Sequence, residues 1–522
     1  MTPSYALPSP SPLRVESMSK PVNIRSVSFR KGVLPATAAA LAAVVLSASW
    51  AAAESPKVAP SRRPNIVLFL IDDLGWTDLS CMGSKLYETP NLDRLAADGL
   101  RFTHAYSACT VCSPTRAAVL TGKYPARLHI TDWIPGQAQR PHSKLLLPDW
   151  TKQLPLEETT LAELLKGAGY ATASVGKWHL GDAGFEPTRQ GFDVNIGGTK
   201  AGSPPGYFGP ASLPGIELKA GESLTERLTE EAARFIESHR EEPFFIYFPH
   251  YTVHTPLQAK PDVVEKYRAK IERLGLAETD VQAPRDLQRQ HPQQHPVYAA
   301  MIESMDQSVG RIMQTLDRLQ LADDTIILFT GDNGGLQSST DNRPARVGKG
   351  SAYEGGVRVP LIVKYPRAVK PNGTSDAAMI SIDYVPTLLD LAGLPASATP
   401  IDGVSFAGLL RGGPAPQRSD LFWHYPHYHA GGATPYGAVR SGDWRLIEFY
   451  EDGRVELYNL RDDVGESRDL AQAEPSRTAE LHKRLQAWRT SVGAQMPAPN
   501  PNFDAAKDAM PVRRKPGAKP KA

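Results

Sequence analysis

The chain has 522 residues, of which 41% are apolar and 22% are charged, so it is long enough for a large core and is neither fibrous nor disordered as a whole. Its 58 basic and 56 acidic side chains give a formal net charge of +2. This balance argues against a nucleic-acid binder, whose affinity would come from neutralising phosphates. The three cysteines are too few for a small domain held together by disulfides.

The first 53 residues predict a secretory signal peptide. Arg30 and Lys31 precede an apolar run over residues 33–50, and Ala51-Ala52-Ala53 supplies a small-residue cleavage site. A membrane anchor is the alternative, but the run is barely long enough to span a bilayer, and no later run reaches about 18 apolar residues. We therefore expect a secreted or periplasmic protein. Its mature chain would hold 53 basic and 55 acidic residues and no membrane span.

Apolar runs of strand length alternate with helical patterns along the mature chain. Residues 66–71 are continuously apolar, as in a strand buried on both faces. Further strands are predicted at 170–175, 244–248 and 325–330, and helices at 161–166 (behind a Thr160–Glu163 capping box), 224–236 and 301–319. This alternation predicts an α/β fold with helices on both faces of one sheet. The segments 181–222 and 255–297 lack clear periodicity and are interpreted as loops.

The pattern changes after about residue 420. Alternating apolar patches at 436–439, 444–450 and 455–460 predict a small antiparallel sheet, and residues 477–490 predict a helix. Residues 496–522 are rich in Pro, Lys and Ala, which is typical of a disordered tail. The sequence thus divides into a signal peptide (1–53), a large α/β domain (62–420), a small α+β subdomain (421–495) and a tail (496–522).

Polar residues follow two of the predicted strands directly. Asp72 and Asp73 come after the first strand, and Asp332 and Asn333 after the strand at 325–330. Ligands of open α/β sheets bind at the carboxyl ends of the strands. These side chains offer only oxygen donors, which suit Ca²⁺ or Mg²⁺ better than Zn²⁺. Three close carboxylates would also repel one another without a cation, although a simple turn cap is the alternative for the first pair.

Cys112 begins the sequence Cys-Ser-Pro-Thr-Arg, which ends at Arg116. A helix start here would lower the pKa of the Cys112 thiol through the helix dipole and the nearby guanidinium. Two other interpretations are open from the residues alone. Cys109 and Cys112 could form a redox pair, or Cys112 could be a buried, inert side chain.

The pattern Cys-x-Pro-x-Arg, followed by Leu120-Thr121-Gly122, resembles the signature of type I sulfatases, which are arylsulfatase-like members of the alkaline phosphatase superfamily. The resemblance runs from about residue 64 to about residue 470. It implies an α/β/α sandwich around a large mixed sheet, with a smaller C-terminal antiparallel sheet plus helix. It also implies that a dedicated maturation enzyme oxidises Cys112 to Cα-formylglycine.

The resemblance further implies the residues of the site. The cation, usually Ca²⁺ with Mg²⁺ as the alternative, would be held by Asp72, Asp73, Asp332, Asn333 and the hydrated aldehyde made from Cys112. Arg116 would support the formylglycine, Lys177 and Lys349 would bind sulfate, and His254 would protonate the leaving group. His179 would accept the proton of the second hydroxyl of the hydrated aldehyde, and the loss of that proton would expel sulfate. His250 is a competing candidate for the role of His254.

The implied activity is hydrolysis of sulfate monoesters. A secreted sulfatase without membrane spans suggests sulfated carbohydrate as the substrate, as a small molecule or an oligosaccharide, by analogy only. Substrate-binding candidates are His427, in an aromatic stretch before the small sheet, and Asp132 and Trp133. Packing at a domain interface is the alternative for His427. The alternative functions are a phosphate or phosphonate ester hydrolase of the same superfamily and a non-catalytic protein that binds sulfated glycans.

Overall fold

The fold is built on a mixed sheet of eight strands. The structure is a computed structural model and describes residues 63–276 and 293–508, so the predicted signal peptide lies outside the described residues. The central strand β1 (Asn65–Ile71) pairs in parallel with β10 and β9, whereas β10 pairs antiparallel with β11. The order is β12 (Gly373–Ser375), β2 (Leu100–Phe102), β11 (Leu361–Lys364), β10 (Thr325–Gly331), β1, β9 (Phe244–Pro249), β5 (Ala171–Val175) and β6 (Val194–Ile196).

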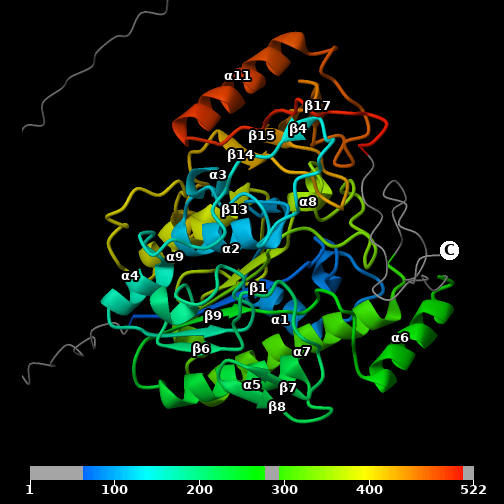
Figure 1. The fold of residues 1–522 in the computed structure, drawn as a ribbon. Helices are drawn as coiled ribbons and strands as arrows, with labels where there is room; N and C mark the ends of the chain where they lie inside the picture. Colours follow the sequence, from blue (N-terminus) through cyan, green and yellow to red (C-terminus); the bar gives the residue numbers. More distant parts are fainter. Residues whose placement is uncertain (1–62, 277–292, 509–522) are drawn as a thin grey trace, which may run out of the picture. The chain divides into compact units, whose positions relative to one another are not determined.

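Helices cover both faces of this sheet because alternate side chains of β1 point to opposite sides. Val67, Phe69 and Ile71 pack into one apolar cluster, and Ile66, Leu68 and Leu70 pack into another. The first cluster is covered by α1 (Pro90–Ala97), α5 (Leu224–Ser238), α6 (Pro261–Arg273) and α7 (Pro296–Arg318). The second is covered by α2 (Cys112–Thr121), α4 (Leu161–Gly167) and α9 (Tyr384–Leu391). Figure 1 shows the two layers on either side of β1, which confirms the α/β/α sandwich.

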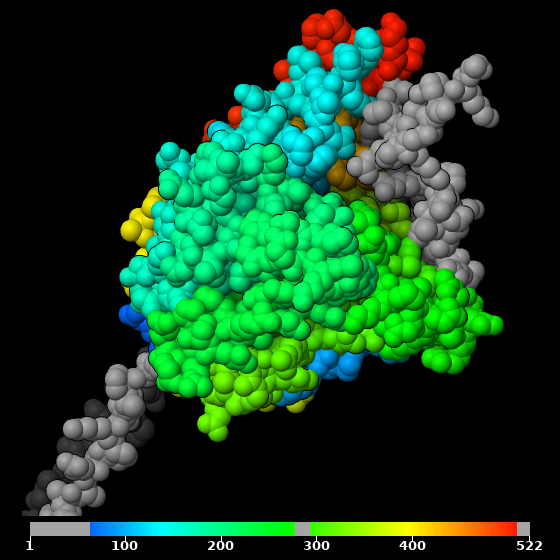
Figure 2. Space-filling view, turned by 60° about the horizontal axis from the view of Figure 1, so that its bottom comes forward, coloured from blue at the N-terminus to red at the C-terminus, as the bar shows by residue number. Residues whose placement is uncertain are grey.

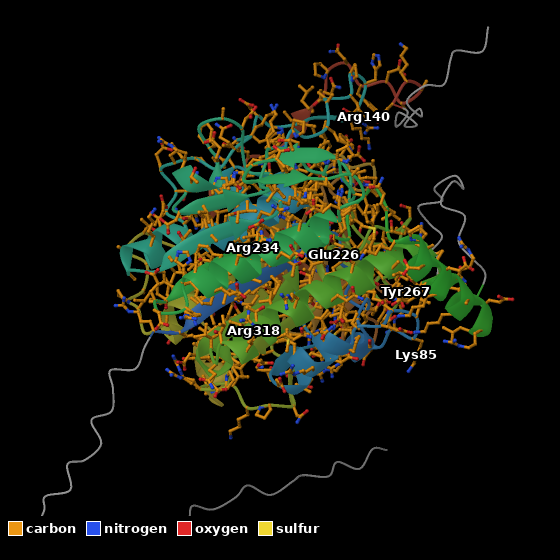
Figure 3. The ribbon with its side chains drawn as sticks, turned by 90° about the horizontal axis from the view of Figure 1, so that it is seen from below. Lys85, Arg140, Glu226, Arg234, Tyr267 and Arg318 are labelled. Carbon is orange, nitrogen blue, oxygen red and sulfur yellow. The ribbon has the colours of Figure 1, made fainter. Side chains whose placement is uncertain are left out.

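The helices α5 and α7 carry charged side chains on the side that faces away from the sheet. Figure 3, which views this layer from below, shows Arg234 of α5 and Arg318 of α7 on its outer side. The segment 181–222, predicted as a loop, contributes the edge strand β6 and the hairpin of β7 (Ala211–Leu213) and β8 (Ile216–Leu218). Its teal to green surface is visible in Figure 2. Among the described helices, none is both long enough and apolar enough to cross a bilayer.

The smaller C-terminal sheet is antiparallel, as expected. It has four strands, of which β14 was not predicted, and α11 (Pro475–Ser491) packs on it. The strands are β14 (Asp420–Tyr425), β15 (Tyr436–Ser441), β16 (Trp444–Phe449) and β17 (Val455–Asn459). The remaining short elements are β3 (Ala105–Tyr106), paired with β13 (Met379–Ile380), and the helices α3 (Pro125–Leu128), α8 (Glu354–Val357) and α10 (Ala407–Leu410).

Two segments differ from the expectation of irregular structure. In the predicted loop 255–297, residues 261–273 form α6, whose Tyr267 and Ile271 are buried against the core. In the predicted tail, β18 (Ala498–Pro499) pairs with β4 (Leu145–Leu146). Asn500 then donates from Nδ2 to the Ser143 carbonyl at 2.7 Å. A few specific contacts therefore order a segment whose composition indicates disorder, whereas residues 509–522 lie outside the described part.

His424 in β14 gives the C-terminal sheet a pH-dependent stability. Its ring is buried between the Tyr450 hydroxyl (2.8 Å from Nδ1) and the Gln495 carbonyl (2.9 Å from Nε2). Burial lowers the pKa of His424 to about 4. As the pH falls, the His424 ring of the unfolded chain takes up a proton near pH 6.5, whereas the buried ring of the folded chain does so only near pH 4. The contribution of the neutral ring to the free energy of unfolding is therefore fully present above pH 6.5 and is lost as the pH falls towards 4.

We expect His424→Gln to lose less stability than the wild type on acidification. Between pH 7 and pH 5 the wild type should lose about 2 kcal/mol more of its free energy of unfolding than the variant. Urea denaturation followed by tryptophan fluorescence measures the difference, with His142→Gln, at a half-buried histidine outside this sheet, as the control. Equal losses in wild type and His424→Gln would contradict the assignment.

Candidate active site

The site lies at the carboxyl ends of β1 and β10. The two strands pair in parallel with Ile71 opposite Gly331, so the residues that follow them emerge side by side. The backbone N–H of Asp73 donates to Oδ1 of Asp332 at 3.2 Å. The side chains of Asp72, Asp73, Asp332 and Asn333 are all buried. The structure thus brings together the four residues that the sequence placed at one cation site.

The backbone is strained at two of the site residues. Asp73 has a φ of 61° and His179 a φ of 58°, in the left-handed region that favours glycine. Such conformations cost of order 1–3 kcal/mol and persist only where the surroundings hold them in place. The Asp73 side chain in this conformation faces Lys349 and His254, and the His179 ring faces the Ile134 carbonyl.

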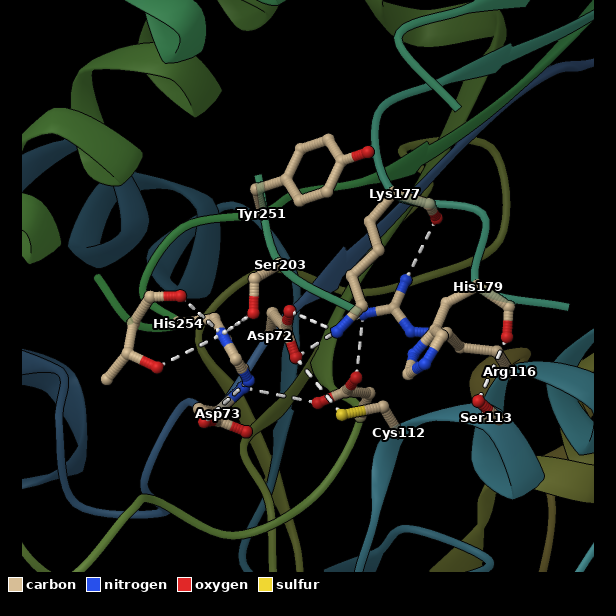
Figure 4. A network of polar contacts seen from close by, with 12 residues as sticks. Asp72, Asp73, Cys112, Ser113, Arg116, Lys177, His179, Ser203, Tyr251 and His254 are labelled. Carbon is tan, nitrogen blue, oxygen red and sulfur yellow. Dashed lines mark hydrogen bonds and ion pairs between the residues drawn. The ribbon is translucent and has the colours of Figure 1, made fainter. Parts of the chain in front are cut away.

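Each buried carboxylate has a basic partner. Lys177 Nζ lies 2.6 Å from Asp72 Oδ2, and Arg116 from α2 lies 2.7 Å from Asp332 Oδ2 and 3.6 Å from Asp72 Oδ1. Lys349 pairs with Asp73. Figure 4 shows Asp72 with Lys177 and Arg116 beside it. The three cations balance the three carboxylates, so the argument that their repulsion alone requires a metal ion does not hold in this structure.

The pKa values of Asp73 and Asp332 are shifted in opposite directions. Burial alone would raise the pKa of Asp73, but Lys349 and His254 outweigh it and hold the pKa well below its usual range. Burial and the adjacent Asp72 raise the pKa of Asp332. The ion pair with Lys349 therefore favours the anionic form of Asp73.

Cys112 is the first residue of α2 and lies inside the network. Its Sγ is 3.6 Å from Asp72 Oδ1 and 3.4 Å from Lys349 Nζ. Burial raises the pKa of the thiol to about 12 and outweighs Lys177 and Lys349, so the predicted lowering by the helix start is wrong. Cys81, Cys109 and Cys112 are all free thiols, which gives no support to a redox pair.

The donor atoms of the network fit a metal ion. Asp72, Asp73, Cys112 and His254 each place one ligand atom within 4.8 Å of the others. Oδ1 of Asn333 is buried and has no hydrogen-bond partner among the described residues, as expected of a metal ligand. The carboxylates of Asp72 and Asp73 and the amide oxygen of Asn333 are hard oxygen donors of the kind that Ca²⁺ and Mg²⁺ prefer, whereas the Cys112 thiol and the His254 imidazole are softer donors.

Of the two candidate histidines, His254 lies at the site. Its Nε2 is 3.7 Å from Asp73 Oδ2, and its Nδ1 lies 2.7 Å from the Thr255 carbonyl and 3.3 Å from Ser203 Oγ. His250 instead points into the helical layer, where it packs on Phe248 with ring centroids 4.3 Å apart. The structure therefore favours His254 over His250.

Two family models cover most of the described chain. Residues 64–394 match the model Sulfatase, and residues 347–491 match the model N-sulphoglucosamine sulphohydrolase, C-terminal. The chain belongs to the sulfatase family. It is a sulfuric ester hydrolase, and the alternative of a phosphate or phosphonate ester hydrolase is not favoured by these matches.

Individual relatives agree with this membership. A sulfatase of Formosa agariphila is 32% identical over 532 residues, which cover 85% of this chain and 92% of the relative. The N-acetylgalactosamine-6-sulfatase of Canis lupus familiaris is 33% identical over 81% of this chain and 78% of its own length. The crystal structure of Ps i-CgsB in complex with k-i-k-neocarrahexaose has a TM-score of 0.68 at 25% identity, covering 85% of this chain and 96% of that chain.

In this sulfatase the three candidate substrate-binding residues lie apart from the carboxylate network. His427 is fully buried, and its Nε2 lies 2.8 Å from Thr131 Oγ1. Asp132 is also fully buried and accepts a hydrogen bond from the Tyr425 hydroxyl at 2.7 Å. Trp133 is half-buried. These contacts agree with the packing alternative for His427, and a role in substrate binding stays a prediction for all three.

The sequence analysis did not predict that Asp78 supports the loop that carries Asp73. Asp78 is fully buried and accepts hydrogen bonds from the Gly75 backbone (2.9 Å), the Tyr298 hydroxyl (2.7 Å) and the Thr340 hydroxyl (2.6 Å). It thereby ties the loop after Asp73 to α7 and to the segment before Lys349. Nothing in its local sequence distinguishes Asp78 from a solvated aspartate, because its partners are far away along the chain.

We expect Asp78→Ala to lower the free energy of unfolding by about 2–4 kcal/mol, because it removes a buried carboxylate that accepts hydrogen bonds from Gly75, Tyr298 and Thr340. The loss of sulfatase activity should exceed the loss expected from the unfolded fraction, since the Asp73 loop is released. Thermal denaturation and activity of the folded fraction measure both effects. Asp262→Ala, at an exposed aspartate of α6, is the control. A change below about 0.5 kcal/mol, the range of ordinary surface substitutions, would contradict this role.

Proposed function

We propose that this sulfatase cleaves sulfate monoesters of a sulfated carbohydrate, using a Cα-formylglycine made from Cys112 and a bound Ca²⁺. The observation that carries the proposal is the position of Cys112, whose Sγ lies between Asp72 and Lys349 within the donor group. A thiol with a pKa of about 12 would be a poor nucleophile near neutral pH, whereas an oxidised residue 112 has no such limitation.

The carbohydrate part of the proposal rests on the relatives. One of them is named for a sulfated amino sugar, and a similar structure was solved with an oligosaccharide. Secretion or periplasmic export, through the predicted signal peptide, would bring the enzyme to such substrates. The proposal also requires a maturation enzyme as a transient partner, because Cys112 is a thiol when the chain is made.

The basic residues would hold the sulfate group. Lys177 and Lys349 extend their ammonium groups to the carboxylates that surround residue 112, and both are buried. In a site from which water is excluded, such charges stabilise the negative charge that grows on the oxygens in the transition state. The Arg116 guanidinium donates to the Asp332 carboxylate and, at 3.0 Å, to the Lys177 carbonyl. Because these contacts hold it in place, Arg116 would orient residue 112 and would not bind the sulfate group.

The formylglycine and the cation would supply chemistry that these side chains lack, namely an oxygen nucleophile and a positive charge that favours the loss of its proton. Asp72, Asp73, Asn333 and residue 112 would hold the ion, with Asp332 beside them. As an imidazolium, His254 would protonate the leaving oxygen through Nε2, because the Thr255 carbonyl holds the proton on Nδ1 and Asp73 faces Nε2.

Mass spectrometry of the tryptic peptide that contains residue 112 tests the maturation. We expect an aldehyde at this position in active enzyme, and we expect Cys112→Ala to lose turnover completely. Cys81→Ser, at a half-buried thiol outside the network, should retain turnover and serves as the control. A preparation that carries only the thiol and still turns over at the full rate would refute the proposal.

The role of His254 predicts a dependence on the leaving group. His254→Ala should lower kcat by about 10²–10⁴-fold on a sugar sulfate, whose alkoxide needs a proton, and much less on nitrophenyl sulfate. His250→Gln, whose ring packs on Phe248 and not beside Asp73, is the matched control and should leave the ratio of the two rates unchanged. Equal losses of His254→Ala on both substrates would exclude the general-acid role. Nitrophenyl phosphate and phenylphosphonate, tested in parallel, should be turned over far more slowly than the sulfate.

A further inference from the structure

The ring of His179 is held by a backbone carbonyl. Its Nε2 forms a hydrogen bond with the carbonyl oxygen of Ile134. Because a carbonyl can only accept, Nε2 must carry the hydrogen, and Nδ1 is then the unprotonated nitrogen of the neutral ring. Nδ1 is buried, and none of the described residues forms a hydrogen bond with it. One ring nitrogen is therefore used for orientation, and the other is left available as a base.

Ser113 ties this contact to the helix that carries Cys112. The backbone N–H of Ile134 donates to Ser113 Oγ at 3.1 Å, and Ser113 Oγ donates to the His179 carbonyl at 2.9 Å. The three residues form a closed ring of hydrogen bonds, so the imidazole cannot rotate without breaking one of them. In Figure 4, His179, Ser113 and Cys112 lie together on the Arg116 side of the network.

Asp132 fixes the segment that presents the Ile134 carbonyl. It accepts hydrogen bonds from the backbone N–H groups of Trp133 (2.9 Å) and Gln137 (3.3 Å) and from the Tyr425 hydroxyl of β14 (2.7 Å). Gly136 within this turn has a φ of 84°, and a Cβ there would lie 2.5 Å from the Trp150 ring. Hydrogen bonds within the turn and one from the C-terminal sheet therefore fix this segment. Both carboxylate oxygens of Asp132 accept hydrogen bonds from other residues of the protein.

We propose that Ser113 and Asp132 are positioning residues that hold His179 in the Nε2–H tautomer, so that Nδ1 is the atom that accepts a proton during turnover. This inference rests on the proposed function, in which the proton comes from a hydroxyl of matured residue 112. In that transfer the O–H bond would break and its proton would bind Nδ1, while its electron pair would form the C=O bond of the aldehyde. The C–O bond to sulfate would break, sulfate would leave, and the imidazolium would return the proton to water before the next cycle. Asp132 is accordingly assigned to this support and not to the substrate.

The tautomer can be measured without any turnover. ¹⁵N-histidine NMR of the full-length chain with an unmodified Cys112 should show His179 protonated at Nε2 only, with the signal assigned by its loss in His179→Gln. Ser113→Ala and Asp132→Asn should give a mixture of the two tautomers. A pure Nδ1–H form in the wild type, or an unchanged Nε2–H form in both variants, would overturn the inference.

Turnover gives a second, independent readout. In matured enzyme, Ser113→Ala and Asp132→Asn should lower kcat by about 10²-fold with KM changed less than about two-fold, because the base is misplaced and binding is not. Ser113→Thr retains the hydroxyl and should restore most of kcat, whereas Ser238→Ala, at an exposed serine of α5, should have no effect. Unchanged kcat in both variants would overturn the inference. If residue 112 proves not to be matured, only the proposed function fails, since the NMR result does not depend on it.

Discussion

The structure of the site depends on keeping three carboxylates buried and charge-balanced at the ends of β1 and β10. Two of them, on Asp72 and Asp332, share Arg116, and Asp72 and Asp73 also have Lys177 and Lys349 as separate partners. A buried charge without its partner costs several kcal/mol, so each cation must arrive in a fixed place. This requirement joins α2, the end of β5 and the segment before α8 to the central strands, although they are far apart along the chain.

The same requirement places residue 112. Arg116 is one helical turn after Cys112 in α2, so fixing the guanidinium on Asp332 also fixes the start of the helix. Lys349 reaches both Asp73 and Cys112 and closes the network from the other side. A divalent ion added here would share oxygen atoms that now face lysine and arginine. These ion pairs therefore fix the position of residue 112 among the charged side chains.

The C-terminal sheet contributes to the site indirectly. Tyr425 of β14 reaches Asp132, and through the following turn the sheet supports the contact between Ile134 and His179. The C-terminal sheet provides none of the network's charged side chains, and this contact joins it to the site. Its buried His424 makes that support sensitive to acid.

Much of this could be predicted from the sequence, because the signals were local. The continuous apolar run gives β1, and Thr160 and Glu163 form the expected capping box of α4. The polar residues at the strand ends and the pattern around Cys112 placed the site residues together. The pKa of Cys112 could not be predicted, since it depends on burial by distant segments. The contacts of Asp78 and of the Ile134 carbonyl are likewise absent from any local pattern.

If Asp72, Asp73 and residue 112 surround one divalent cation, folded full-length protein should retain calcium after dialysis. Elemental analysis should find a stoichiometric amount of calcium in the wild type and in Asp462→Asn, an exposed control, and none in Asp73→Asn. A wild type that holds no divalent metal ion at millimolar calcium, or an Asp73→Asn variant that retains it fully, would contradict the account.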